Sequence, residues 1–292
     1  MAVDKLQDRI RKLKNPSVID LNMLPEHIPP HISERDTDFA TAYSYCCEQI
    51  LDGLQNVVPA VRLSMNAMML YGGFGLQALS NLLRKARELG YYVFLDVPGA
   101  YSAIDAQRSA DVLLDGANPF CFDALVLSDY IGSDGIRPFC DKLNDSEKDL
   151  FVLARTANKS AFELQDLLSG TRLMHMAAAD VIGRYADAFL GRYQYSQIGV
   201  TGSATASDSL RNLRNGNPNL FLLVDGYDMS GANAKNCSAA FDALGHGAIV
   251  CAGTGVTAAW MQSPADAEDY VAQAVEAATR MCKNLTRYIT IL

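Results

Sequence analysis

Polar residues able to do chemistry stand at the ends of short apolar runs. The segment VFLDVPGAY (93–101) is the clearest, because Asp96 closes an apolar run and Pro98 and Gly99 then turn the chain. A carboxylate in this position is suited to act as a base or to stabilise developing charge. The corresponding residues of the other runs are Asn22, Arg62, Ser128 with Asp129, Arg155 with Thr156, Thr201, Asp225 and Thr254. Strand ends are also polar simply because they meet water, so the complete ring, rather than any single residue, predicts a ligand site.

Two glycine-rich segments, DGYDMSG (225–231) and AGTGV (252–256), follow the last two apolar runs. Glycine lets backbone N–H groups approach a phosphate, and a following helix adds partial positive charge. Gly226, Gly231, Gly253 and Gly255 therefore predict a phosphate site. The alternative is that these glycines only make tight turns, since neither segment contains Lys or Arg.

No metal-binding pattern is present in the sequence. The four histidines, His27, His31, His175 and His246, fall in expected loops or helices, and no HExxH motif or paired-carboxylate spacing accompanies them. GxSxG nucleophile elbows and Walker loops are also missing. We therefore expect no metal site.

The elements that would position these residues are short apolar runs alternating with longer segments of helical periodicity. Near-continuous apolar runs are typical of parallel strands covered on both faces. The runs are 17–22, 58–65, 91–97, 123–129, 149–156, 195–202, 219–226 and 247–255. Eight strand–helix units predict an α/β fold, a single (β/α)8 TIM barrel over residues 1–292, with an extra helical segment at about 169–192. In such a barrel the active site is built from the C-terminal strand ends, where the polar ring lies.

The amino-acid composition argues against several other classes of protein. Of the 292 residues 49% are hydrophobic and 20% charged, which is ordinary for a folded globular protein. A net charge of −8 argues against a general nucleic-acid binder, which needs clustered cations. No signal peptide and no run of about 18 apolar residues is present, so no membrane partner is expected. The seven cysteines include no CxxC pair, and buried thiols in a cytoplasmic protein are the simplest interpretation.

The order of several motifs resembles the longer, type 2 branch of the orotidine 5′-phosphate decarboxylases. The similar segments run from DKLQDRIRKLKNPSVIDLN through AVRLSMNAMMLYG, VFLDVPGAYSAID, DYIGSDGIRPF and FVLARTANKSAFELQDL to IGVTG, LLVDGYDMSG and IVCAGTGV. They cover nearly the whole chain. The most specific are YIGSD (130–134) and ARTAN followed by ELQDL (154–158 and 163–167).

The resemblance implies removal of carbon dioxide from C6 of orotidine monophosphate without metal or organic cofactor. In that family a Lys-Asp-Lys-Asp array destabilises the substrate carboxylate and stabilises and protonates the carbanion, while the last two loops hold the phosphate. In this sequence Arg62 stands at the second-strand lysine and Asp96 keeps the first aspartate of the third-strand motif. Pro98 and Tyr101 stand at the other lysine and aspartate. Proline has no ionisable group and arginine is a poor acid, so we expect only a trace of decarboxylation.

Further positions of the family pattern are replaced. Asn22 stands at the first-strand aspartate that binds the sugar, Ser230 at the loop-seven glutamine and Thr254 at the loop-eight arginine. The resemblance thus implies Asp96 and Arg62 as catalytic residues and contacts to the substrate from Asn22, Ser128, Thr156, Thr201 and Asp225. The expected phosphate contacts are Gly226, Ser230, Gly231, Gly253, Thr254 and Gly255.

Two functional hypotheses follow. The first is an enzyme of the decarboxylase family that binds a phosphorylated pyrimidine nucleotide or sugar phosphate. The second is a non-catalytic paralogue that binds a phosphorylated ligand or pairs with an active relative. The resemblance also implies a homodimer, in which Tyr101, at the position of an aspartate shared across the interface, would pack as an aromatic anchor.

Overall fold

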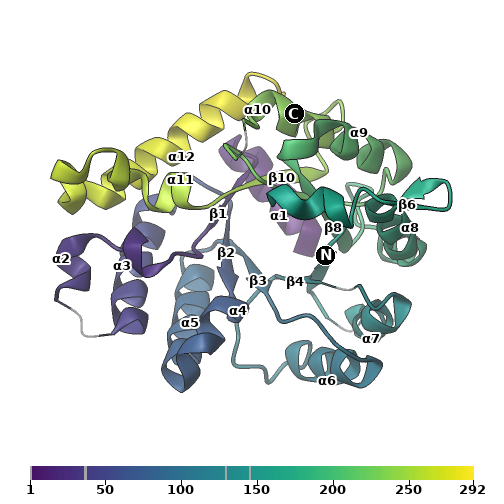
Figure 1. Cartoon of the computed structure of the whole chain (residues 1–292), viewed down its shortest axis with the longest axis horizontal. Coiled ribbons are helices and arrows are strands. Elements are labelled where there is room, and N and C mark those ends of the chain that lie inside the picture. The colour runs from purple at the N-terminus through teal and green to yellow at the C-terminus, as the bar shows by residue number, and fades with distance from the viewer. Residues whose placement is uncertain (1, 36–37, 129, 145, 230) are drawn as a thin grey trace.

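The computed structural model describes residues 2–35, 38–128, 130–144, 146–229 and 231–292, and its centre is a closed barrel of eight parallel strands ringed by helices (Figure 1). The strands pair in the order β1-β10-β9-β8-β5-β4-β3-β2. Their bounds are β1 Ser17–Asp20, β2 Ala60–Ser64, β3 Tyr92–Asp96, β4 Ala124–Leu127, β5 Asp149–Val152, β8 Ile198–Ser203, β9 Leu222–Asp225 and β10 Ala248–Ala252. Seven lie within the predicted runs and β8 extends one residue beyond its run, to Ser203, so the predicted TIM barrel is confirmed.

The α-helices flank this barrel and include several of a single turn. They are α1 Ala2–Leu13, α2 Pro30–Ser33, α3 Phe39–Leu54, α4 Met65–Met68, α5 Gly72–Glu88, α6 Ala103–Leu113, α7 Ser133–Leu143, α8 Met174–Ala186, α9 Ser207–Gly216, α10 Ala234–Cys237, α11 Thr254–Thr257 and α12 Tyr270–Thr286. Side-chain caps start two of the longer ones: Asp38 accepts from the Thr41 N–H before α3, and Ser102 accepts from the Asp105 N–H before α6. Among the described helices, none is long and apolar enough to cross a membrane.

The expected helical segment at 169–192 begins differently. A small antiparallel pair, β6 Leu168–Ser169 and β7 Arg172–Leu173, precedes α8. Gly170 has a φ of +65°, which suits the tight connection between the two strands. The helix therefore starts only at Met174, and it packs against β8.

α1 covers the N-terminal end of the barrel. Its residues Val3, Leu6 and Ile10 are buried, and the Gln7 side chain accepts a hydrogen bond from the Gly247 N–H at the start of β10. Because these residues recur on one face of α1, the helix buries that face against the barrel and covers its N-terminal end. The opposite, C-terminal end of the strands is left for a site, as in other barrels of this class.

The barrel interior is filled by side chains that alternate along each strand. On β3, Tyr92, Phe94 and Asp96 share one face because successive residues of a strand point to opposite sides. The rings of Tyr92 and Phe94 lie 5.0 Å apart, and Phe94 and Phe151 5.2 Å apart. Gly199 on β8 leaves room for this packing, since a Cβ there would lie 2.6 Å from the Phe151 ring. Aromatic rings thus fill the interior below Asp96.

Candidate active site

Four charged side chains meet at the C-terminal end of the barrel. The register pairs Asp20 of β1 with Arg62 of β2, and Arg62 with Phe94 of β3, so all three face the same side of the sheet. Asp96 lies two residues beyond Phe94 and shares that face. The fourth side chain, Asp225, ends β9. Strand alternation therefore brings three carboxylates around one guanidinium.

Arg62 is held by two of these carboxylates. Its Nε donates to Asp96 Oδ1 at 2.8 Å and its Nη1 donates to Asp225 Oδ1 at 2.7 Å. Cys251 Sγ on β10 lies 3.8 Å from the same Nη1. The Arg62 side chain is 12% exposed, so these bonds are shielded from water and fix the guanidinium in place.

Burial controls the protonation of this cluster. Burial raises the pKa of Asp20 to about 7; nearby Arg62 opposes that rise, and Asp96 and Asp225 add to it. Burial likewise raises the pKa of Asp96, against the opposing effect of Arg62. For Arg62, burial alone would lower the pKa, but the attraction of Asp225 and Asp96 raises it well above its usual value. Arg62 is thus a permanent cation, whereas Asp20 is able to carry a proton near neutral pH.

A cavity of about 740 Å³ opens at this end of the barrel. Eight residues that the sequence predicted for the site line it: Asn22, Arg62, Thr156, Asp225, Gly226, Gly253, Thr254 and Gly255. Asp96 lies behind Arg62, to which it is bonded. Among the described lining residues, Arg62 is the sole Lys or Arg, and it is outnumbered by Asp20, Asp225 and Asp228. The volume suits a nucleotide-sized ligand.

The loops after β9 and β10 form one wall of the cavity. Gly226 has a φ of +86° and lies close to the loop after β5, since a Cβ on it would be 2.8 Å from Ala157 Cβ. A Cβ on Gly255 would meet nothing within 4 Å, so the backbone here is open to a ligand. Asp228, Gly253 and Gly255 also line a second, smaller cavity of about 60 Å³, which Arg280 of α12 lines as well.

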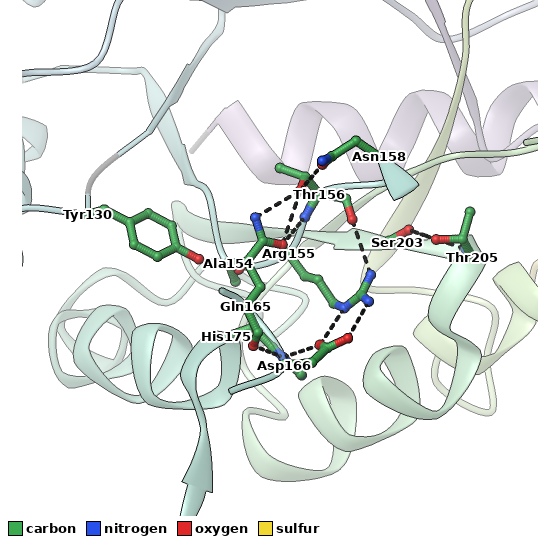
Figure 2. Close-up of polar contacts among 10 residues, drawn as sticks. All are labelled: Tyr130, Ala154, Arg155, Thr156, Asn158, Gln165, Asp166, His175, Ser203 and Thr205. Carbon is green, nitrogen blue, oxygen red and sulfur yellow. Dashed lines mark hydrogen bonds and ion pairs between the residues drawn. The ribbon is translucent and has the colours of Figure 1, made fainter. Parts of the chain in front are cut away.

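The loop after β5 forms a second wall through Thr156, Ala157 and Asn158 (Figure 2). Arg155 makes a bidentate ion pair with Asp166, with Nε–Oδ1 at 3.0 Å and Nη2–Oδ2 at 2.7 Å. Gln165 accepts a hydrogen bond from the Thr156 N–H at 2.9 Å. The segments ARTAN and ELQDL, which carry the sequence resemblance most specifically, are therefore bonded to each other beside the cavity.

Other predicted site residues lie elsewhere. Thr201 is buried, and its hydroxyl accepts from the Ala154 N–H and lies 3.3 Å from the Arg155 carbonyl, so it supports the β5 loop from behind. Ser128 and Gly231 are exposed and do not line the cavity. Ser230 and Asp129 lie outside the described residues. Pro98 and Tyr101, at the expected positions of a lysine and an aspartate, are both exposed, Tyr101 to 95%.

Sequence reasoning missed Asp20, Asn158, Asp228 and Cys251, all of which line the cavity. The last polar residue of the first run is Asn22, so the sequence pattern points to Asn22 and passes over Asp20. The alternation of side chains along a strand could have identified Asp20. It lies two residues after buried Val18 and therefore on the same face of β1. Asn22 instead donates its backbone N–H to Asp20 Oδ1 at 3.0 Å.

Known proteins share both this sequence and this fold. The chain is 30% identical over 235 residues to the orotidine 5′-phosphate decarboxylase of Rhodopirellula baltica, spanning 79% of this chain and 78% of that protein. It is 27% identical over 261 residues to the enzyme of the same name from Clostridium acetobutylicum, spanning 89% and 90%. The chain belongs to the orotidine 5′-phosphate decarboxylase family. No family model matches it.

Solved structures agree with this membership of the decarboxylase family at the level of the fold. The OMP decarboxylase of Leishmania donovani superposes with a TM-score of 0.74 at 23% identity, covering 98% of each chain. The orotidine 5′-monophosphate decarboxylase of Methanocaldococcus jannaschii, solved with the inhibitor BMP, gives 0.62 at 12% identity, covering 93% of this chain and 98% of that one. The barrel fold is therefore the one found in these decarboxylase structures.

Proposed function

We propose that the chain acts in pyrimidine nucleotide metabolism as an orotidine 5′-phosphate decarboxylase-type barrel. It binds a pyrimidine nucleotide in the cavity of about 740 Å³ at the C-terminal end of the barrel, the mouth cavity. The observation that carries the proposal is the convergence of charged side chains from three adjacent strands: Asp20 and Arg62 line this cavity, and Asp96 is bonded to Arg62 behind it. Relatives bearing the decarboxylase name span most of the chain, which supports the same ligand class.

The phosphate of this nucleotide would bind between the loops after β9 and β10. Gly253 and Gly255 leave the backbone accessible there, and Thr254 is exposed at the start of α11. The described part of the cavity wall contains no cation at this end, so main-chain N–H groups carry the contact. We expect weaker phosphate binding than in a protein with an arginine at position 254.

Decarboxylation would use the charged cluster. Arg62 lines the cavity with Asp96 bonded behind it, and its positive charge would stabilise the carbanion that remains after carbon dioxide leaves. Asp20, with its pKa raised to about 7, is the group suited to give a proton to C6 and to regain one from water. Because Arg62 is already bonded to two carboxylates, its charge is largely compensated, and we expect turnover far below the common enzyme value of about 1 per second.

The test is to incubate purified protein with orotidine monophosphate and to follow uridine monophosphate by ultraviolet absorbance, with binding of uridine monophosphate measured by calorimetry. We expect binding, and a trace of turnover that Asp20→Asn and Arg62→Ala remove. Binding without any turnover in the unmodified protein would favour the non-catalytic alternative. Failure to bind the nucleotide at millimolar concentration would refute the proposal itself.

We also propose that the protein is a cytoplasmic homodimer. Large apolar side chains are exposed on the segments that follow the neighbouring strands β2 and β3, namely Leu70 at 83%, Phe74 at 84%, Tyr101 at 95% and Ile104 at 70%. Exposed apolar residues of this size are typical of protein interfaces. Sedimentation should give a dimer, and Phe74→Glu should convert it to a monomer; a monomeric unmodified protein at micromolar concentration would exclude the dimer.

A further inference from the structure

A large cavity, which we call the basal cavity, lies at the opposite end of the barrel from the mouth cavity. It has a volume of about 440 Å³ and is formed by the C-terminal parts of α5 and α6, the loop before β4 and Lys148 before β5. These segments lead into the N-terminal ends of β3, β4 and β5. The two cavities share none of their described lining residues. The charged residues that line the basal cavity are Arg84, Arg87, Glu88, Asp115 and Lys148.

Two cations of the basal cavity converge on one backbone oxygen. The Phe122 carbonyl accepts from Arg87 Nη1 at 3.0 Å and also from Lys148 Nζ. Arg87 Nη1 is paired with Asp123 Oδ1 at 2.9 Å, and the other oxygen of that carboxylate accepts from the Val93 N–H at 2.9 Å. Both oxygens of Asp123 are therefore engaged, and within the described residues Lys148 makes no ion pair with a carboxylate.

Positive charge is concentrated at Lys148. Burial, and then the charge of nearby Arg87, lower the pKa of the Lys148 ammonium. Lys148 is partly buried, whereas the other four charged side chains of the cavity, Glu88 and Asp115 included, are exposed. A bound anion would offset the repulsion between Lys148 and Arg87, because each cation would then face a negative charge.

Arg84 adds a third cation to the same cavity. It lies three residues before Arg87 on α5, so the two side chains share one face of the helix. Its Nη2 donates to Asn81 Oδ1 within the same helix. A guanidinium has five N–H donors, so this bond leaves Arg84 able to bind a ligand.

We propose that the basal cavity is a second ligand site, in which Arg84, Arg87 and Lys148 bind the phosphate group of a small molecule. Guanidinium and ammonium groups form strong, charge-assisted hydrogen bonds with phosphate oxygens. The volume of about 440 Å³ is within the range of small-molecule sites and exceeds what one phosphate needs. Because the mouth cavity contributes no residue, the inference does not depend on the function proposed for that cavity.

The test uses Cys121, which lines the basal cavity, as a local reporter. Cys121 is exposed, whereas the other six cysteines are buried or partly buried. Its alkylation by neutral iodoacetamide is followed by peptide mass spectrometry, with inorganic pyrophosphate as the probe. A bound anion covers the thiol or neutralises the cations that favour its thiolate, and both effects slow the reaction. We expect pyrophosphate to slow alkylation of Cys121 about tenfold at saturation and to leave Cys282 on α12 unaffected.

Sodium chloride at equal ionic strength is the control for screening, which needs no site. Ribose 5-phosphate in a parallel arm distinguishes the source of the phosphate group. Saturable protection by either compound supports the site, and the compound that protects at the lower concentration shows whether the ligand is inorganic or a phosphate ester.

Arg84→Glu tests whether these cations are the cause. The variant reverses an exposed charge whose printed bond stays within α5, and we expect half-protection to need about tenfold more pyrophosphate. Arg211→Glu makes the same charge change on α9, where Arg211 is exposed and bonded within its own helix to Asp208, and should leave half-protection unchanged. Lys148→Met should abolish protection; if this half-buried change unfolds the protein, Arg84→Glu still decides.

Two results would overturn the inference. One is protection no greater than that given by sodium chloride. The other is half-protection at the same pyrophosphate concentration in Arg84→Glu and in the unmodified protein. Either result leaves nucleotide binding in the mouth cavity untouched, because that binding is measured separately with uridine monophosphate.

Discussion

Arg62 on β2 reaches past two strands to Asp225 on β9, with Nη1 and Oδ1 2.7 Å apart. In the closed barrel β1 and β10 lie between these strands, so the bond crosses the mouth rather than following its rim. The same guanidinium binds Asp96 on β3. One cation therefore ties together strands from distant parts of the chain, and its removal would leave three carboxylates without a counter-charge.

Replacement of this cation should be costly. We expect Arg62→Met to lower the free energy of unfolding by about 3–5 kcal/mol at pH 8, because buried carboxylates lose their partner. The loss should shrink toward pH 5 as Asp20 and Asp96, whose pKa values are raised, take up protons. Urea unfolding at pH 8 and at pH 5 measures the loss of stability and its decrease at the lower pH. Lys85→Met, which removes an exposed pair with Asp52, is the control and should cost at most about 1 kcal/mol.

Asp20 should make stability depend on pH in a definite direction. Its pKa is about 7 in the folded protein and lower in the unfolded chain, so the folded state holds the extra proton and stability falls as pH rises from about 4 through 7. We expect Asp20→Asn to match the unmodified protein at pH 4 and to exceed its free energy of unfolding by about 4 kcal/mol at pH 8. A variant that is less stable at pH 8 would show that the Asp20 charge is stabilised by Arg62 instead.

A cation added at the phosphate loop should strengthen binding. Thr254 is exposed in the cavity wall, and Thr254→Arg introduces a charge-assisted contact with room to form. We expect about tenfold tighter binding of uridine monophosphate and of inorganic phosphate, measured by calorimetry. Thr254→Ala should bind as the unmodified protein does. An unchanged affinity in the arginine variant would place the phosphate elsewhere.

Restoring the third-strand lysine alone should not restore fast decarboxylation. Pro98 is exposed at the loop after β3, and the charged groups around Arg62 remain paired with one another in Pro98→Lys. We expect turnover of orotidine monophosphate to stay within about tenfold of the unmodified protein, since acid and electrostatic groups act together in the transition state. A gain of several orders of magnitude would show that position 98 alone limits the reaction.

The barrel was predictable because its strands are covered on both faces and so appear as continuous apolar runs. Asp96 and Asp225 were found because they end such runs, and Arg62 because it is the one charged residue within the run 58–65. Asp20 was missed because the apparent strand continued to Asn22, whereas β1 ends two residues earlier. Asn158 and Gln165 belong to an irregular loop, whose hydrogen bonds depend on backbone turns that residue types alone do not reveal.

The aromatic rings below Asp96 also govern where protons travel. Phe94, Phe151 and Phe221 are fully buried and stacked edge to face across the barrel, which leaves apolar material beneath the carboxylates. Protons reach Asp20 and Asp96 from the cavity side, where water enters. A ligand seated in the cavity would therefore cover the side from which Asp20 exchanges protons with water, so binding of the ligand and protonation of Asp20 should depend on each other.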